Sequence, residues 1–218
     1  MQHHPASAAA IVVQNPKPAT AAPLHTLAPN AATVAEFLRR LGHPVALVGR
    51  KPLNGSGGQI VIWPAETDDP ADVACGLAYE FQNVYCNLNE LNPDVLKIVP
   101  AAGISIRDAM IARRSHLLID IDGPPKEEAR AQFAALCVEI GKPLIATDSG
   151  NGYGLIYDFG LPNTRDDTIR VTSFLQQLKD RHPRVDIAVA SASRLTRVIG
   201  TLNRCKVTGD LVATHILN

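Results

Sequence analysis

Two aspartates, Asp120 and Asp122, end a run of apolar residues in the segment HLLIDID (116–122). The apolar run predicts a strand, and side chains two residues apart on a strand project to the same face. Two carboxylates this close repel each other unless a cation lies between them, and hard divalent cations such as Mg²⁺ and Mn²⁺ prefer oxygen ligands. The pair therefore predicts a divalent-metal site or, alternatively, two solvated carboxylates flanking a turn.

A glycine-rich segment, TDSGNGYG (147–154), follows the aspartates in the sequence. Gly150 and Gly152 permit positive φ angles, so successive backbone N–H groups would converge on an anion, with the Ser149 hydroxyl as a further donor. The alternative is an ordinary hairpin turn, because Asn-Gly is itself a hairpin signal. The segment is consistent with both interpretations.

Two further groups of residues have types suited to phosphate chemistry. Asp186 enters an apolar stretch in RVDIAV, where it would add a third carboxylate to a site for one or two metals or would cap a strand. Arg194 and Arg197 in SRLTR carry forked, permanently charged donors that match phosphate oxygens. The alternative for the arginines is a solvated basic loop.

The elements that must position these residues alternate along the chain. Hydrophobic periodicity and glycine stops predict helices, while β-rich runs predict strands. The expected helices cover 31–42, 70–81, 126–140 and 165–181, and the expected strands lie in 44–50, 59–64, 83–91, 116–122 and 143–161. Segment 105–114 is expected to be helix or loop. The pattern indicates an α/β or α+β fold with a sheet covered by helices.

Composition sets the domain organisation. The chain has 218 residues, enough for one substantial domain or two small lobes that share a core. Residues 1–29 are rich in Ala and Pro and predict a flexible leader, so the domain is expected over 30–218. The loop KPLNGSGG (51–58) lacks the order of a Walker phosphate loop and is expected to be a connector.

The net charge is zero, so any nucleic-acid surface must come from local basic clusters. The candidates are Arg113, Arg114, Arg204 and Lys206. The four cysteines are scattered without paired spacing, which argues against a zinc site or a disulfide framework and fits a reducing cytoplasm. The sequence contains no apolar run long enough to span a membrane.

The order of four blocks resembles the archaeo-eukaryotic primase superfamily, in particular the primase–polymerase domains of phage and plasmid replication proteins. The blocks are NLNELN, ARRSHLLIDIDGP, TDSGNGYGLIYDFGLPN and VDIAVASASRLTRVIGTLNR, which together cover about the C-terminal two thirds. The resemblance implies an archaeo-eukaryotic primase-like catalytic domain with an RNA-recognition-motif-like sheet.

The resemblance also implies roles for individual residues. Asp120, Asp122 and Asp186 would be the catalytic carboxylates that hold Mg²⁺ or Mn²⁺. The incoming nucleotide would be bound by Ser149, Gly150, Asn151, Gly152, Tyr153, Arg194 and Arg197. The implied reaction is nucleotidyl transfer on a single-stranded DNA template with nucleoside triphosphates as substrates, and a replicative helicase from a separate protein is an expected partner.

The sequence departs from the family pattern at Gly154. The family has a histidine in a GYHLLY-like pattern where this chain reads GYGLIY, and His116 is the candidate in the sequence to replace it. The alternative function is therefore a primase-like domain that binds nucleotide or nucleic acid without efficient catalysis. A second alternative follows from LLIDIDG, which also resembles the first motif of haloacid-dehalogenase-type phosphatases, although no later GDxxxD follows it.

Overall fold

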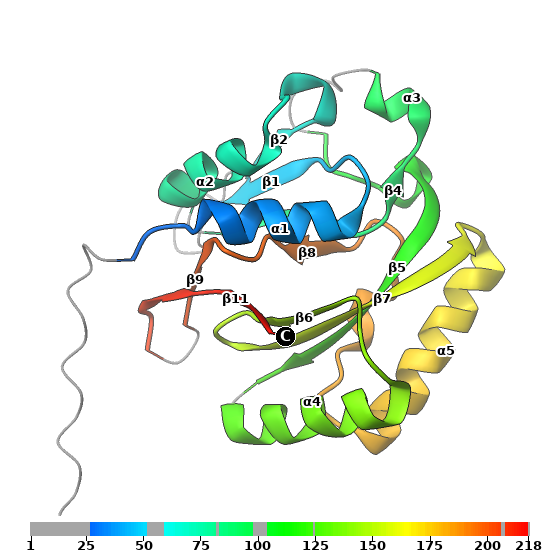
Figure 1. Ribbon diagram of the computed structural model, residues 1–218. Coiled ribbons are helices and arrows are strands. Elements are labelled where there is room, and N and C mark those ends of the chain that lie inside the picture. The colour runs from blue at the N-terminus through cyan, green and yellow to red at the C-terminus, as the bar shows by residue number, and fades with distance from the viewer. Residues whose placement is uncertain are drawn as a thin grey trace, which may run out of the picture.

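The computed structural model describes residues 27–51, 59–81, 83–97, 104–123, 125–205 and 208–217. Within them, two main antiparallel sheets lie one above the other in Figure 1, with helices packed beside each sheet. The fold is thus mixed helix and sheet, as expected. Most of the expected leader, loop residues 52–58 and Lys206 lie outside the described residues.

The upper sheet has four strands in the order β2-β1-β3-β8, all antiparallel. Its strands are β1 (Leu47–Arg50), β2 (Gln59–Ile62), β3 (Val84–Asn87) and β8 (Leu195–Arg197). Helix α2 (Pro70–Phe81) packs on β1 and β3 of this sheet, and helix α1 (Ala31–Leu41) packs against α2. Helix α1 begins at Asn30, whose side chain accepts the Thr33 N–H, and ends at Gly42 with φ 69°.

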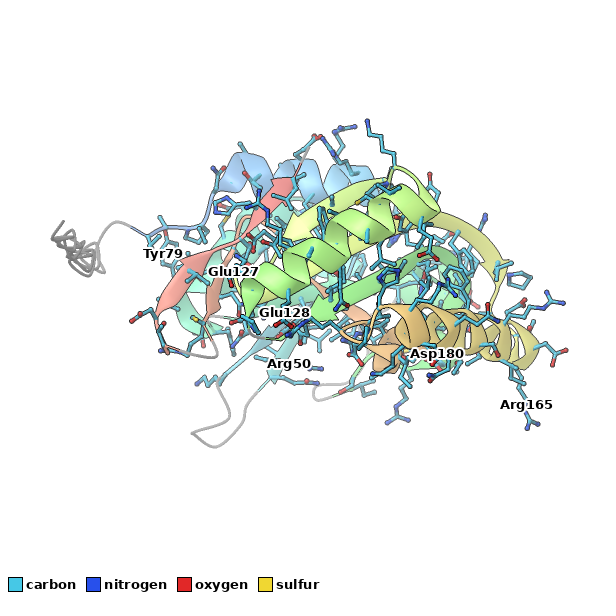
Figure 2. The ribbon with its side chains drawn as sticks, turned by 90° about the horizontal axis from the view of Figure 1, so that it is seen from below. Arg50, Tyr79, Glu127, Glu128, Arg165 and Asp180 are labelled. Atoms are coloured by element: carbon cyan, nitrogen blue, oxygen red, sulfur yellow. The ribbon has the colours of Figure 1, made fainter. Side chains whose placement is uncertain are left out.

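The lower sheet has five strands in the order β11-β6-β7-β5-β4. Its strands are β4 (Glu90–Leu91), β5 (Ile111–Asp122), β6 (Ile145–Asp148), β7 (Gly152–Pro162) and β11 (His215–Leu217). Helices α4 (Lys126–Ile140) and α5 (Arg165–Arg181) lie side by side on its outer face in Figure 2. An ion pair between Arg181 and Glu139 joins the two helices.

Short elements connect and flank the two sheets. They are the 3₁₀ turns η2 (Pro64–Glu66), η3 (Asp108–Met110) and η4 (Ile187–Ala190), the helix α3 (Pro93–Leu96), and the hairpin of β9 (Leu202–Arg204) and β10 (Leu211–Ala213). Among the residues that the structure describes, no helix is long and apolar enough to cross a membrane.

Successive side chains of the inner part of β5 point to opposite faces of the lower sheet. Ile119 and Ile121 are fully buried, and the neighbour of Ile121 on β7, Tyr153, packs on Phe133 of α4 with ring centroids 5.1 Å apart. The alternate residues of β5, including Asp120, therefore face away from the helices. This alternation turns Asp120 and Asp122 toward the cavity between the two sheets.

Two expected elements differ from the structure. Segment 105–114 was expected to be helix or loop, but only η3 is helical and Ile111 onward is already β5, because β7 pairs with β5 along nearly its whole length. The single strand expected over 83–91 is divided at Leu88 and Asn89, and its two parts join different sheets. This division makes the segment a link between the sheets.

Candidate active site

A cavity of about 760 Å³ lies between the two sheets. Its walls come from both, since β3 and β8 contribute one side and β5, β6 and β7 the other. The lining residues are Asn83, Tyr85, Leu118, Asp120, Asp122, Thr147, Ser149, Asn151, Gly154, Arg194, Leu195, Thr196, Arg197, Ile199, Asn203, Arg204, Cys205 and Gly209. This volume is within the range of ordinary small-molecule sites.

Asp120 and Asp122 share the face of β5 that lines this cavity, as their spacing predicted. Their register partners on β7 are Gly154 and Gly152, respectively. A Cβ on Gly152 would lie 2.3 Å from the Ile121 carbonyl oxygen, so only glycine permits this close approach of the two strands. The surface of the cavity next to both carboxylates is therefore formed by the backbone of β7.

Asp186 lies beside Asp120, but it is not part of a strand as expected. Its backbone N–H donates to the Asp120 carbonyl at 2.9 Å, next to an isolated bridge between Ile121 and Val185. Its Oδ1 accepts the Ala188 N–H at 2.9 Å and thereby caps η4. This oxygen therefore caps a 3₁₀ turn and not a strand, as the alternative interpretation had it, while Oδ2 faces a cation.

That cation is the Arg194 guanidinium. Its Nη2 lies 3.7 Å from Asp120 Oδ2 and 3.8 Å from Asp186 Oδ2, and all three side chains are about one-third exposed. The arginine therefore partly neutralises the acidic cluster. Its Nε is buried without a hydrogen-bond partner among the described residues, so this donor is unsatisfied.

The donor set fits a divalent metal bound together with substrate. Among the described residues, no three His, Cys, Asp or Glu side chains are grouped closely enough to hold a metal ion alone. Mg²⁺, however, is commonly held by one or two carboxylates and completes its octahedron with water and substrate phosphates. Asp120 and Asp122, two hard oxygen donors on one cavity wall, match that pattern.

Arg197 forms part of the opposite wall, on β8. Its Nη2 donates to Tyr85 Oη at 2.9 Å and to Asn83 Oδ1 at 3.2 Å, and its Cζ lies 4.8 Å from the Tyr85 ring centroid. Its Nη1 is buried without a partner among the described residues. Burial lowers the pKa of this guanidinium, with the nearby Tyr85 and Asp120 acting in the opposite direction. A partly desolvated arginine with an unused donor is suited to bind a phosphate.

The glycine-rich turn is a hairpin turn and not an anion nest. The Ser149 N–H donates to the Gly152 carbonyl, the Gly150 N–H to Asp148 Oδ1 and the Gly152 N–H to Ser149 Oγ. These three backbone donors are therefore used within the turn. Of the predicted turn residues, Ser149 and Asn151 line the cavity, whereas Gly150 and Gly152 only shape it.

Tyr153 and Arg114 were predicted to bind nucleotide and nucleic acid, but both lie in the interior. Tyr153 faces α4 and is 7% exposed. Arg114 is 3% exposed and donates to the Ala190 carbonyl and to Thr168 Oγ1 at 2.8 and 2.7 Å. Both side chains are therefore enclosed by protein atoms, so neither is available to a ligand.

The other predicted basic residues differ in position. Arg204 lines the main cavity. Arg113 is exposed at the opposite end of β5 from Asp120, near Glu90 at 4.0 Å, and it lines a separate cavity. Because Asp120 comes seven positions later on the strand, about 20 Å separates Arg113 from the carboxylates.

His116 does not replace the absent imidazole. It pairs with Asp158 on β7, four residues along from Gly154, and its Nε2 lies 2.9 Å from the Leu41 carbonyl under α1. The room beside Gly154 is instead taken by Thr147, because a Cβ at position 154 would lie 2.7 Å from Thr147 Oγ1. Thr147 is therefore the side chain nearest to the place where the family has its histidine.

Tyr85, Thr147 and Asn203 are among the residues of the site that were not predicted from the sequence. Tyr85 alternates with buried Val84 and Cys86 on β3, and this alternation was the available signal. Asn203 donates to the Ser149 carbonyl at 2.6 Å and so holds the turn against β9. No local pattern indicates that contact, because 54 residues separate the two positions.

The two-sheet architecture matches the fold of archaeo-eukaryotic primase-type catalytic domains, as the sequence motifs implied. The solved structures that share it include the primase–polymerase domain of cyanophage S-2L. That match has a TM-score of 0.59 and 13% identity, and it covers 88% of this chain and 91% of the other.

The plasmid-type primase RepB' shares the same fold, with a TM-score of 0.54 and 14% identity over 86% of this chain. The match spans 56% of that RepB' chain. The catalytic domain of RepB', solved in complex with initiator DNA, gives a TM-score of 0.54 and 13% identity over 86% of this chain and 84% of the other. No protein-family model and no curated protein sequence matches this chain. The likeness to these proteins is therefore one of fold.

Proposed function

We propose that this protein is a metal-dependent primase–polymerase that transfers nucleotides onto a 3′-hydroxyl on a single-stranded DNA template. The observation that carries the proposal is the composition of the main cavity. Asp120 and Asp122 form one wall, while Arg194 and Arg197 each bring a buried N–H without a partner among the described residues. Carboxylates for a divalent cation opposite donors for phosphate are the requirements of phosphoryl transfer.

The acidic, basic and neutral side chains of the main cavity would have different roles. Asp120 and Asp122 would hold the divalent metal, which when bound lowers the pKa of the attacking hydroxyl and offsets charge on the phosphates. Arg197 would donate to the triphosphate from the β8 wall, and its hydrogen bonds to Tyr85 and Asn83 fix its direction. Ser149 and Asn151 lie at the edge of the cavity, where their side chains donate to the Gly152 and Arg204 carbonyls, and they would shape the nucleotide pocket without adding charge.

Primer synthesis and extension on single-stranded DNA with Mn²⁺ or Mg²⁺ test this proposal. Asp122→Asn keeps the shape of the side chain and removes its charge, so activity should fall by about 100-fold or more. Asp180→Asn on the outer side of α5, labelled in Figure 2, is the matched control and should retain activity. Equal activity in both variants would contradict the proposal.

Gly154 supports a second candidate function, a domain of this fold that binds nucleotide or nucleic acid with little catalysis. Glycine contributes no side chain beside Asp120, and Thr147 occupies the adjacent space. A histidine at 154 alone would collide with Thr147 Oγ1, so the informative variant is Thr147→Ala combined with Gly154→His. A native protein that is inactive but binds nucleotide, together with an active double variant, would establish this second function.

A further inference from the structure

A second cavity, of about 380 Å³, lies beside the main one on the face of the upper sheet that α1 and α2 leave open. Its described lining consists of Val48, Arg50, Gln59, Val61, Tyr85, Ser105, Ile106, Ser191, Ser193, Arg194 and Leu195. Tyr85, Arg194 and Leu195 also line the main cavity, so these three side chains form a shared wall. A ligand in one cavity therefore touches the boundary of the other.

The chemistry of this second cavity is that of an anion site. Its described lining contains two arginines, three serines and one glutamine, but no aspartate or glutamate. Arg194 Nε is buried without a hydrogen-bond partner among the described residues. Such a donor costs free energy unless a ligand accepts from it. Arginine and hydroxyl donors in one hollow match the oxygens of a phosphate.

The polar side chains of this second cavity are held in place by neighbouring segments. Gln59 Nε2 donates to Ser105 Oγ at 2.7 Å, which joins β2 to the segment before η3. The backbone N–H of Ser193 donates to Asp108 Oδ1 at 2.8 Å, which fixes the loop that carries the hydroxyl. The donors are thus arranged before any ligand binds, which reduces the entropy lost on binding.

Tyr85 connects this site to the main cavity. The guanidinium of Arg50, on β1, lies 5.4 Å from the centroid of the Tyr85 ring. The guanidinium of Arg197, on β8, lies 4.8 Å from the same centroid. A row of guanidinium, aromatic ring and guanidinium therefore crosses the sheet from one cavity to the other. Basic groups interleaved with an aromatic ring along a groove are the features that bind single-stranded nucleic acid.

We propose that this second cavity binds a backbone phosphate of the single-stranded nucleic acid that enters the main cavity. The inference rests on the proposed function for the identity of the strand, but the binding itself requires neither metal nor catalysis. Arg50, exposed at the end of β1, and Arg194, on the shared wall, would contact the phosphate. Tyr85, on the shared wall, would lead the strand from this cavity toward the main one.

The test is the binding of a fluorescent oligothymidylate to the full chain, without divalent metal or nucleotide, measured by anisotropy across a salt series. Arg50→Gln removes one phosphate contact. The slope of log affinity against log salt should become shallower by about 0.7, as expected for single strands. Arg165→Gln, an exposed arginine at the start of α5 that Figure 2 places on a separate part of the molecule, should leave the slope unchanged.

A parallel titration with nucleoside triphosphate and Mn²⁺ separates the two sources of phosphate. The proposal is supported if Arg50→Gln weakens oligonucleotide binding several-fold and leaves nucleotide affinity unchanged. Weakened nucleotide binding with unchanged oligonucleotide binding would overturn it in favour of a free-nucleotide site. Unchanged binding of both ligands would also overturn it. Because this assay needs no turnover, an inactive Asp122→Asn protein that still shows the Arg50 effect would separate this proposal from the catalytic one.

Discussion

Arg194 has two sets of partners, because its guanidinium lies beside two carboxylates and also lines both cavities. A positive charge within 4 Å of Asp120 opposes the binding of a divalent cation to the same carboxylate. The same charge favours a nucleotide, whose phosphates bring several negative charges. We expect the arginine to weaken metal binding in the absence of nucleotide and to strengthen nucleotide binding.

Arg194→Gln tests this dual role. Without nucleotide, the variant should bind Mn²⁺ several-fold more tightly, because it lacks the competing charge. Its affinity for the Mn²⁺–nucleotide complex should fall, since a charge-assisted hydrogen bond contributes about 1.5–3 kcal/mol. Electron paramagnetic resonance of free Mn²⁺ measures the first quantity and isothermal titration calorimetry the second. Parallel changes in both affinities would contradict the dual role.

The carboxylate spacing could be predicted from the sequence, but the positions of the basic residues could not. Asp120 and Asp122 share a face because of strand alternation alone, and this is a local property. Whether Arg114 or Arg197 is buried depends on elements distant in sequence. Arg114 donates to Ala190, 76 residues away, and Arg197 donates to Tyr85, 112 residues away. The sequence therefore identified arginines as candidate phosphate-binding residues, but it did not show which of their side chains are exposed.

At the scale of elements, the glycine-rich turn depends on the β9–β10 hairpin packed against it. Gly150 has φ 83°, and a Cβ there would lie 2.3 Å from Val212 Cγ2 on β10. Asn203 on β9 donates to the Ser149 carbonyl, and Asn151 donates to the Arg204 carbonyl. The turn therefore presents Ser149 to the cavity only while this hairpin is in place.

Gly150→Ala should destabilise the protein by more than about 1 kcal/mol, since it combines left-handed strain with a steric overlap. Gly76→Ala is the matched control. Gly76 lies inside α2, and a Cβ added there would meet nothing within 4 Å, so the same chemical change should stabilise by about 0.5–1 kcal/mol. Urea unfolding followed by circular dichroism measures both. Destabilisation of similar size in both variants would contradict this account of the turn.

Helices were predicted more accurately than strands. The bounds of α2, α4 and α5 agree with the expected 70–81, 126–140 and 165–181. Helical hydrogen bonds are local, and their periodicity and stops are written in adjacent residues. Strand bounds depend on partners, and for this reason the early part of β5 and the division between β3 and β4 were missed.

At the scale of the whole molecule, one buried amide ties the two sheets together. Asn89 is 1% exposed and lies in the link between β3 and β4. Its Oδ1 accepts the His116 N–H of β5 at 3.0 Å, and its Nδ2 donates to the Ala192 carbonyl at 2.9 Å, in the loop before β8. Asn89 therefore helps to fix the distance between the two walls of the main cavity.

Asn89→Leu should cost about 2–4 kcal/mol of unfolding free energy, because it leaves two buried backbone groups without partners. Gln176→Leu, on an exposed side of α5 where the amide donates to Asp180, should change stability by less than about 0.5 kcal/mol. Denaturant midpoints measured side by side decide between these expectations. A small effect of Asn89→Leu would mean that water or a shifted backbone replaces the two hydrogen bonds of the Asn89 side chain.

The pairing of β8 with β3 also affects the order in which parts of the protein fold. Tyr85 and Arg197 meet only after the chain closes a loop of 112 residues, and such closure is slow. A ribosome adds about 5–20 residues per second, so the strand with Asp122 emerges several seconds before Arg197. During that interval a nascent chain would carry its carboxylates beside an unfinished cavity. Affinity for phosphate should therefore be among the last properties that the folding protein acquires.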